Sequence, residues 1–170
     1  MALWRDGGFA EDSWRKLDDA EPAPVAGAII VSFARWSAER DALVARADPV
    51  GVSIAAGAEA RAQLAEAALR PLVALDFPKF ADGRAFSYGE LLRERFGFAG
   101  ELRATGDVLL DEIPLMRRCG FTSFEIADPP TLSALRDGHV PAPSLFYQPS
   151  VGPREAPAGT RPWLRKAAGA

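Results

Sequence analysis

The sequence predicts an α/β protein with a mostly parallel sheet of five or six strands, built from repeated βα units as an open sheet or a partial barrel. Short apolar runs alternate with helix-like segments, and the run centres recur every ~20–30 residues, about the size of a βαβ unit. The first three runs are continuously apolar, as is typical of parallel strands covered on both faces. Five or six such units are too few for a closed barrel of eight strands.

Each element of the repeat has its own signals. The strands are predicted at residues 28–33, 50–55, 72–75, 101–104 and 123–126, with a sixth, edge strand at 144–147. The helices are predicted at 37–47, 58–69, 87–96, 107–119 and 130–136. Ser37 can cap the first helix, and Pro71 follows the alanine-rich second one. Ser87 and Glu90 match a capping box at the start of the third helix. Glycines follow the last three helices, at Gly97, Gly120 and Gly138.

Pro114 lies inside the predicted helix at 107–119, where it lacks the amide hydrogen that a helix interior requires. Either the helix kinks at Pro114, or a separate first turn precedes a main helix that starts there. We favour the kink, because Leu109, Ile113 and Met116 keep one apolar face across the proline.

The chain is predicted to form one α/β domain, residues 25–148, with two distinct ends. The N-terminal arm, residues 1–24, holds six acidic and three basic residues, and forms a hairpin, a strand laid on the domain, or a loose arm. The tail, residues 149–170, is rich in Pro, Gly and Ala and holds four basic residues against one acidic residue. Either these charged ends are simply solvated, or one of them docks a partner.

Composition excludes several classes of protein. The net charge of −3 gives no overall attraction to nucleic acid or to an anionic membrane. A single cysteine, Cys119, excludes an intrachain disulfide and a cluster held by four thiolates of one chain. The chain shows no signal-peptide pattern and no apolar stretch of the ~20 residues that a spanning helix needs. We therefore expect a cytoplasmic protein.

Charged residues gather directly after the predicted strand at 72–75. Asp76, Lys79, Asp82 and Arg84 lie between this strand and the next helix, at the strand's carboxyl end, where α/β proteins usually hold their sites. Lys79 and Arg84 could frame a carboxylate, phosphate or sulfur oxyanion, steered by Asp76 or Asp82. Alternatively the charged side chains of the loop find their partners within it, with Asp82 capping a turn and Arg84 paired with an acid.

Arg103 extends this hypothesis to the next strand. A charged residue on an interior parallel strand needs a partner or a cleft, and Arg103 would lie near Asp76 or Asp82 if the strands are neighbours. Asp107 opens the following helix, whose free amides could bind an anion, although capping is its simpler role. Asp76 and Asp82 are thus predicted to orient the anion-binding groups or move protons. The predicted substrate-binding residues are Lys79, Arg84, Arg103 and Asp107.

The sequence indicates no cofactor and no metal. One histidine, His139, and one cysteine argue against a structural zinc site, and a metal held by carboxylates alone has no support. No dinucleotide-binding glycine motif, P-loop or nucleophile-elbow motif is present. Cys119 is expected to be unreactive, because the end of a helix disfavours a thiolate.

Three segments carry a family resemblance: Leu75-Asp-Phe-Pro-Lys-Phe-Ala-Asp-Gly-Arg84, Gly100-Glu-Leu-Arg-Ala-Thr-Gly-Asp107, and Arg117-Arg-Cys-Gly-Phe121 with Phe124-Glu125. Over about residues 73–126 the chain resembles a family of uncharacterised proteobacterial proteins, classed as a domain of unknown function. Its members are commonly described as oxidoreductases of sulfite reduction, and their genes tend to lie beside those for assimilatory sulfite reductase and phosphoadenylylsulfate reductase. The resemblance implies a pathway and supplies no catalytic residues.

We therefore expect an accessory protein of assimilatory sulfate/sulfite reduction that acts on or beside sulfite reductase and binds a small oxyanion. Two alternatives stay open. The same loop could serve a small-molecule enzyme with an Asp general base. The protein could instead be a non-catalytic adaptor for sulfite reductase, with an exposed apolar patch from Trp4, Trp14 or Phe98. The sequence leaves open whether the protein is an enzyme and whether it forms a homo-oligomer.

Overall fold

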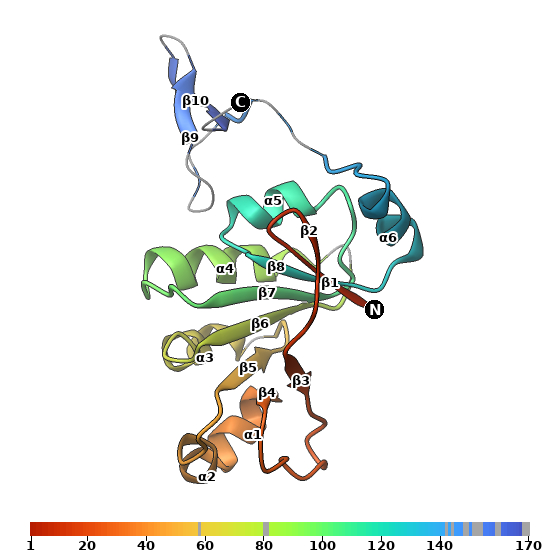
Figure 1. Cartoon of the computed structure of the whole chain (residues 1–170). Coiled ribbons are helices and arrows are strands. Elements are labelled where there is room, and N and C mark those ends of the chain that lie inside the picture. The colour runs from red at the N-terminus through yellow and green to blue at the C-terminus, as the bar shows by residue number, and fades with distance from the viewer. Residues whose placement is uncertain are drawn as a thin grey trace.

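The computed structural model describes residues 1–57, 59–79, 82–141, 143, 145–147, 150, 155–158 and 161–167. In this part of the chain an eight-stranded mixed sheet is flanked by helices, and a two-stranded hairpin lies near the C-terminus (Figure 1). The strands of the main sheet are β1 (Ala2–Arg5), β2 (Gly8–Ala10), β3 (Trp14–Lys16), β4 (Ala28–Ser32), β5 (Val50–Ile54), β6 (Leu72–Phe77), β7 (Glu101–Gly106) and β8 (Ser123–Ile126). The helices are α1 (Phe33–Ala38), α2 (Arg40–Val44), α3 (Ala60–Ala67), α4 (Arg84–Glu94), α5 (Ile113–Arg118) and α6 (Pro129–Arg136). The hairpin consists of β9 (Glu155–Ala158) and β10 (Arg161–Ala167).

The main sheet is curled into a half-barrel. Its strand order is β2-β1-β8-β7-β6-β5-β4-β3, with parallel pairing from β3 to β8 and antiparallel pairing of β1 with both β2 and β8. In a flat sheet the seven spacings between β2 and β3 would place these outer strands roughly 34 Å apart. Residues 11–13, which join β2 to β3, reach at most about 14 Å. The outer strands must therefore approach each other, which only a curled sheet allows.

The α/β class and the mostly parallel sheet are confirmed, but the predicted count of five or six strands is wrong. Residues 1–24, for which the sequence allows a hairpin, a strand laid on the domain or a loose arm, contribute β1, β2 and β3 to the sheet, with β1 and β2 paired as an antiparallel hairpin. Of the edge strand expected at 144–147, the described residues 145–147 are not part of the main sheet. Among its described residues, Phe146 forms an isolated bridge with Arg165 of β10.

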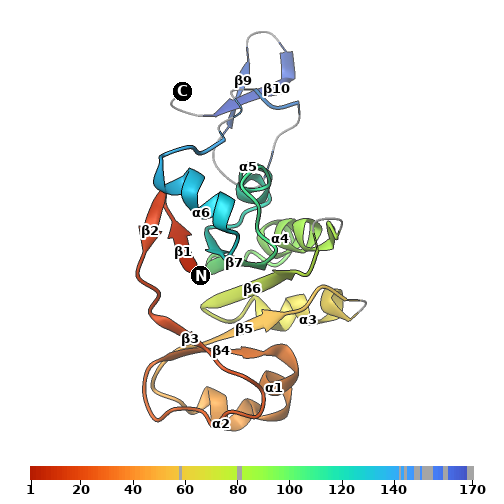
Figure 2. The ribbon, with the colours of Figure 1, turned by 90° about the vertical axis from the view of Figure 1, so that its right-hand side faces the viewer.

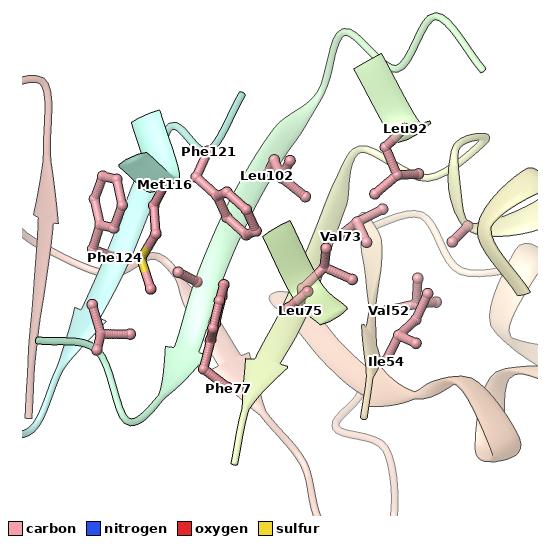
Figure 3. Packing of buried hydrophobic residues seen from close by; sticks show 14 of the residues in the cluster. Val52, Ile54, Val73, Leu75, Phe77, Leu92, Leu102, Met116, Phe121 and Phe124 are labelled. Carbon is pink, nitrogen blue, oxygen red and sulfur yellow. The ribbon is translucent and has the colours of Figure 1, made fainter. Parts of the chain in front are cut away.

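One face of the sheet packs against the helices. Figure 3 shows Val73 and Leu75 of β6 near Leu92 of α4, with Met116 of α5 further along the same face of the sheet. All four side chains are at most 1% exposed, so this layer is the main core of the molecule. Such burial of large apolar side chains is the dominant stabilising contribution to a fold of this kind.

The opposite, inner face of the half-barrel is crossed by the N-terminal segment. Figure 2 shows α3 and α4 on one side of the central strands and the segment from β2 to β3 on the other. Trp14 of β3 packs against a second, smaller cluster of Ile30, Leu72 and Ala74. Because successive residues of a strand point to opposite faces, the residues in register with Ala74, namely Arg103 and Ser123, share this inner face.

Several helix boundaries differ from the prediction. The kink at Pro114 is wrong: α5 begins at Ile113 with the proline in its first turn, where a missing amide hydrogen costs nothing. The first helix starts directly after β4, with Ser32 as its N-cap in place of Ser37. The third begins at Arg84, so the capping-box start at Ser87 is wrong as well.

The predicted glycines at the ends of the last three helices are confirmed. The three glycines placed after the helices all have positive φ angles, of 61°, 95° and 77° for Gly97, Gly120 and Gly138. The amide of Phe121 donates to the carbonyl of Met116 at 3.1 Å, and the amide of His139 to that of Ala134 at 2.8 Å. These bonds span six residues, as in the usual glycine-terminated helix end.

Candidate functional site

The charged residues of the predicted loop lie at the carboxyl edge of the sheet. β6 continues through Asp76 to Phe77, two residues beyond the predicted end of the strand, so Asp76 lies within the sheet. Lys79 and Asp82 follow in the loop that leads to α4, and Arg84 is the first residue of that helix. Residues 80 and 81 lie outside the described residues.

Asp82 and Arg84 neutralise each other. The guanidinium donates to both carboxylate oxygens, with 2.8 Å from Nε to Oδ1 and 2.6 Å from Nη2 to Oδ2. The Arg84 guanidinium lowers the pKa of Asp82 to about 2. Nη2 of Arg84 also lies 3.3 Å from the carbonyl oxygen of Ala56. This arrangement matches the alternative interpretation of the sequence, in which the charged groups of the loop pair with one another and form no anion site.

Asp76 and Asp107 have structural contacts at the same edge. Asp76 accepts a long hydrogen bond from the Thr105 hydroxyl, at 3.4 Å. The amide of Asp107 donates to the carbonyl of Phe77 at 2.7 Å, and the side chain of Asp107 is exposed. Gly106 makes this approach possible, because its φ is 89° and a Cβ there would lie 2.5 Å from the Phe77 carbonyl oxygen.

Lys79 is the remaining cation of the predicted loop. Its side chain is exposed, and among the residues that the structure describes none forms an ion pair with it. A single exposed ammonium is strongly hydrated and holds an anion weakly. Among the described residues, the carboxyl edge therefore has one unpaired cation, Lys79, whereas the predicted anion site requires several cations.

Arg103 lies on the inner face of the half-barrel, away from this loop. Its side chain is only 1% exposed and its guanidinium forms two ion pairs. Nη1 and Nη2 donate to the two carboxylate oxygens of Asp12, at 2.7 and 3.0 Å. Nε and Nη2 donate to Oε1 of Glu101, at 3.0 and 2.9 Å. Burial alone would lower the pKa of Arg103, but these bonds outweigh it and raise the pKa above its ordinary value.

β6 and β7 are neighbours as expected, yet Arg103 does not reach Asp76. Arg103 is in register with Ala74, whereas Asp76 is in register with Thr105, two residues further along. No hydrogen bond or ion pair joins Arg103 to Asp76 or Asp82 within the described residues. The structure thus separates Arg103 from the other residues of the predicted site.

Glu101 and Asp12 are the residues that sequence reasoning missed. Glu101 accepts from the Ser123 hydroxyl at 2.6 Å and lies 3.6 Å from the Arg5 guanidinium, in addition to its bonds with Arg103. Asp12 is 91 positions from Arg103 in the sequence. No local pattern signals such a pair, because it depends on the N-terminal segment crossing the sheet.

Glu112 has an unusual environment near the carboxyl edge. It precedes α5, and its Oε2 is buried without a hydrogen-bond partner among the described residues. Burial, with repulsion from Asp111 and Asp107, raises the pKa of Glu112. A carboxyl group with a raised pKa is a familiar feature of general acids and bases.

Cys119 is not placed for nucleophilic chemistry. It is buried, and its thiol donates to Oε1 of Glu90 at 3.5 Å. Burial and the neighbouring Glu90 carboxylate raise the pKa of Cys119 to about 12, so the group stays a thiol at neutral pH. Within the described ranges, no three His, Cys, Asp or Glu side chains are grouped so as to hold a metal ion.

Comparison with known proteins identifies the family. The chain belongs to a family described as a bacterial protein of unknown function (DUF934), whose sequence model matches residues 51–157. The match begins in β5 and ends in β9, so it includes the carboxyl edge and Arg103 but not the N-terminal strands. Searches of curated proteins and of solved structures found no match to this chain. Over the described residues, no helix is both long enough and apolar enough to span a membrane.

Proposed function

We propose that this member of the DUF934 family is an accessory protein of assimilatory sulfate/sulfite reduction that works by contact with a partner, sulfite reductase, and not by chemistry of its own. The pathway rests on the resemblance of the segments around Asp82, Arg103 and Cys119 to the family linked with sulfite reduction. The mode of action rests on how the charges of the molecule are paired.

The internal pairing of the cations is the observation that carries this proposal. Arg84 is held by Asp82 through two hydrogen bonds, and Arg103 by Asp12 and Glu101 through four. At the carboxyl edge a bound oxyanion would have to displace the Asp82 carboxylate, which already has favourable geometry with Arg84, and Arg103 lies on the inner face away from that edge. An oxyanion site at the carboxyl edge is therefore less favoured than a role in protein binding.

The region around α5 is suited to a protein contact. Leu115 on α5 is 48% exposed, and Leu145 and Tyr147 are 54% and 70% exposed. Between the latter two, Phe146 packs under the guanidinium of Arg118 on α5, 4.1 Å from ring centre to Cζ, which ties this segment to the helix. We call Leu115, Leu145 and Tyr147 the α5 surface. Exposed apolar side chains on neighbouring segments of a protein are typical of an interaction site. An exposed patch from Trp4, Trp14 or Phe98 is not formed, because Trp4 and Phe98 are buried and Trp14 is half-buried.

The pathway is tested by growth of a strain that lacks the gene, with sulfate, sulfite or sulfide as its sole sulfur source. Growth on sulfide alone is the expected result, because sulfide bypasses the reduction of sulfite. Normal growth on all three sources would remove the link to sulfite reduction.

The mode of action is tested by complementing that strain with single variants. Leu115→Arg should fail to restore growth on sulfite, because a charge on the α5 surface opposes burial against a partner. Val44→Arg is the matched control: Val44 is 58% exposed on α2, which lies at the other end of the sheet (Figure 1). Equal growth of the two variants would contradict a contact through α5.

A small-molecule enzyme remains the second candidate, and the raised pKa of Glu112 is the observation that favours it. If Glu112 were a general base, Glu112→Gln would abolish complementation while leaving the fold intact. The adaptor role predicts that this variant restores growth, because the substitution leaves Leu115, Leu145 and Tyr147 unchanged, and glutamine keeps an acceptor oxygen for the hydrogen bond with the Leu109 backbone.

A further inference from the structure

A cavity of about 230 Å³ opens on the inner face of the half-barrel, where the N-terminal segment crosses the sheet. Residues of β1 and β3 line one part of the cavity, and Arg103 of β7 and Glu125 of β8 line the other. The volume lies below the ~300–1,000 Å³ of sites for drug-sized ligands, so it suits a small metabolite. Its lining includes Leu3, Asp12, Trp14, Lys16, Arg103 and Glu125.

The charged groups of this cavity are of both signs. Lys16 on β3 and Glu125 on β8 form no ion pair with any residue in the described ranges. Arg103 has five N–H groups, and four of them are used by Asp12 and Glu101, which leaves one N–H on Nη1 without a partner among the described residues. The cavity thus presents unused cationic donors and an unused carboxylate together.

The apolar side of the cavity is firmly placed. Trp14 packs against Ile30, Leu72 and Ala74, and Leu3 is 5% exposed. A large aromatic side chain held in this way provides rigid contact area for an apolar group at little cost in conformational entropy.

We propose that this cavity binds a small zwitterion, namely a free α-amino acid with an apolar side chain. Lys16 and the remaining N–H of Arg103 receive its carboxylate, Glu125 receives its ammonium group, and Trp14 and Leu3 contact its side chain. The buried ion pair of Arg103 with Asp12 holds the cavity in shape, since it ties the segment between β2 and β3 to the middle of the sheet. This inference concerns the inner face and is independent of the adaptor role proposed for α5.

The balance of charge selects a zwitterion over an ion of one sign. A simple anion would meet Lys16 but would also face the carboxylates of Glu125 and Asp12. A simple cation would meet Glu125 but would face Lys16 and Arg103. Only a ligand that carries both charges places its carboxylate at the unused cationic groups and its ammonium group at the unused carboxylate. Bringing like charges together in a partly enclosed site has an unfavourable free energy.

The test is isothermal titration calorimetry of the full chain with the protein L-amino acids, beginning with L-leucine and L-methionine. The tightest binder is then compared with its N-acetyl and amide derivatives, each of which lacks one charge. We expect saturable binding of at least one apolar amino acid and a loss of affinity of roughly tenfold or more for both derivatives. If no amino acid binds, or if either derivative binds as tightly as its parent, the proposal is wrong.

Matched variants locate the ligand. Lys16→Met and Glu125→Gln should each weaken binding roughly tenfold or more, whereas Lys79→Met and Glu94→Gln should not change it. Lys79 and Glu94 are exposed residues outside this cavity, and all four variants are checked for an unchanged circular dichroism spectrum. The indole N–H resonance of Trp14 should shift on titration. Binding that survives both cavity variants would place the ligand elsewhere and overturn the assignment.

Discussion

Replacing Arg103 by methionine tests the buried charge cluster that joins the N-terminal segment to the sheet. Methionine keeps most of the length of the side chain, so the loss is chiefly of charge and hydrogen bonds. Removing one partner of a buried ion pair costs ~3–5 kcal/mol, because the other charge stays buried and unpaired. Here Glu101 keeps the Ser123 hydroxyl and the Arg5 guanidinium, and the Asp12 side chain is already 34% exposed. We therefore expect the lower end, a decrease of about 3 kcal/mol in the free energy of unfolding.

Asp12→Asn should have a smaller effect. Arg103 keeps its two bonds to Glu101, and asparagine retains one acceptor oxygen for the guanidinium. Because hydrogen bonds with a charged group contribute ~1.5–3 kcal/mol, the partial loss should amount to about 1–2 kcal/mol. The double variant should lose less than the sum of the two single losses, since both act on one interaction. Urea unfolding followed by circular dichroism measures all three, with an unchanged m value as the sign that the compactness of both states is preserved.

The effect of Asp12→Asn should also depend on pH. Burial would raise the pKa of Asp12, but the hydrogen bonds from Arg103 and from the Trp14 amide outweigh it and lower the pKa. The unfolded chain therefore binds a proton more readily than the folded one, and the carboxylate stabilises the fold above its unfolded pKa of ~3.9. The difference in stability between the native chain and Asp12→Asn should be full at pH 7 and shrink as the pH falls below about 4.

A native-like stability of Arg103→Met, within about 0.5 kcal/mol, would refute this reasoning. So would a difference between the native chain and Asp12→Asn that stays constant from pH 7 to well below pH 4. Either result would mean that the Arg103 cluster does not hold the N-terminal segment on the sheet.

Three further predictions concern other parts of the molecule. Arg93→Ala should lower the free energy of unfolding by about 2–3 kcal/mol in urea titrations, because its guanidinium donates to the carbonyls of Phe98, Gly100 and Gly120. Cys119 should react with a thiol reagent at pH 8 only at the rate of unfolding, since burial raises its pKa to about 12; fast reaction of the folded chain would contradict this. Asp128→Ala should lower the Tm at pH 7 but much less near pH 2, because its bonds with Thr131 at the start of α6 lower the pKa of this carboxyl.

The central strands could be predicted because each is a continuous run of apolar residues, and such a run by itself indicates a buried strand. β8 has the predicted bounds, and β4 and β5 each end one residue earlier than predicted. The N-terminal strands could not be predicted in the same way. β2 and β3 have three residues each, and they form strands because they pair with β1 and β4. Such pairing depends on the tertiary fold and leaves little trace in so short a sequence.

The start of α4 illustrates how a correct local rule can select the wrong residue. Ser87 and Glu90 fit a capping box, but the helix begins three residues earlier, at Arg84. There the Asp82 carboxylate lies 3.3 Å from the amide of Arg84, so the start is already provided with an acceptor. The same carboxylate pairs with the Arg84 guanidinium, which removes Asp82 and Arg84 from the predicted anion site.

The predicted site is therefore only partly assembled by the fold. Asp76, Lys79, Asp82, Arg84 and Asp107 do lie at the carboxyl edge, which the order of strand and helix predicts. Arg103 lies on the neighbouring strand, but its side chain is bound to Asp12 and Glu101. The sequence shows which residues are charged, whereas the partner of each charge depends on segments that meet only in the folded chain.

Complementation by the double variant Asp82→Ala/Arg84→Ala tests the central claim most directly. The claim is that these paired charges shape the loop before α4 and that the protein acts on sulfite reduction by contact. The double variant, folded according to its circular dichroism spectrum, should restore growth of the deletion strain on sulfite to the rate seen with the native chain. Failure to restore growth by a folded and normally abundant double variant would show that the edge itself carries out the function, and would contradict the account.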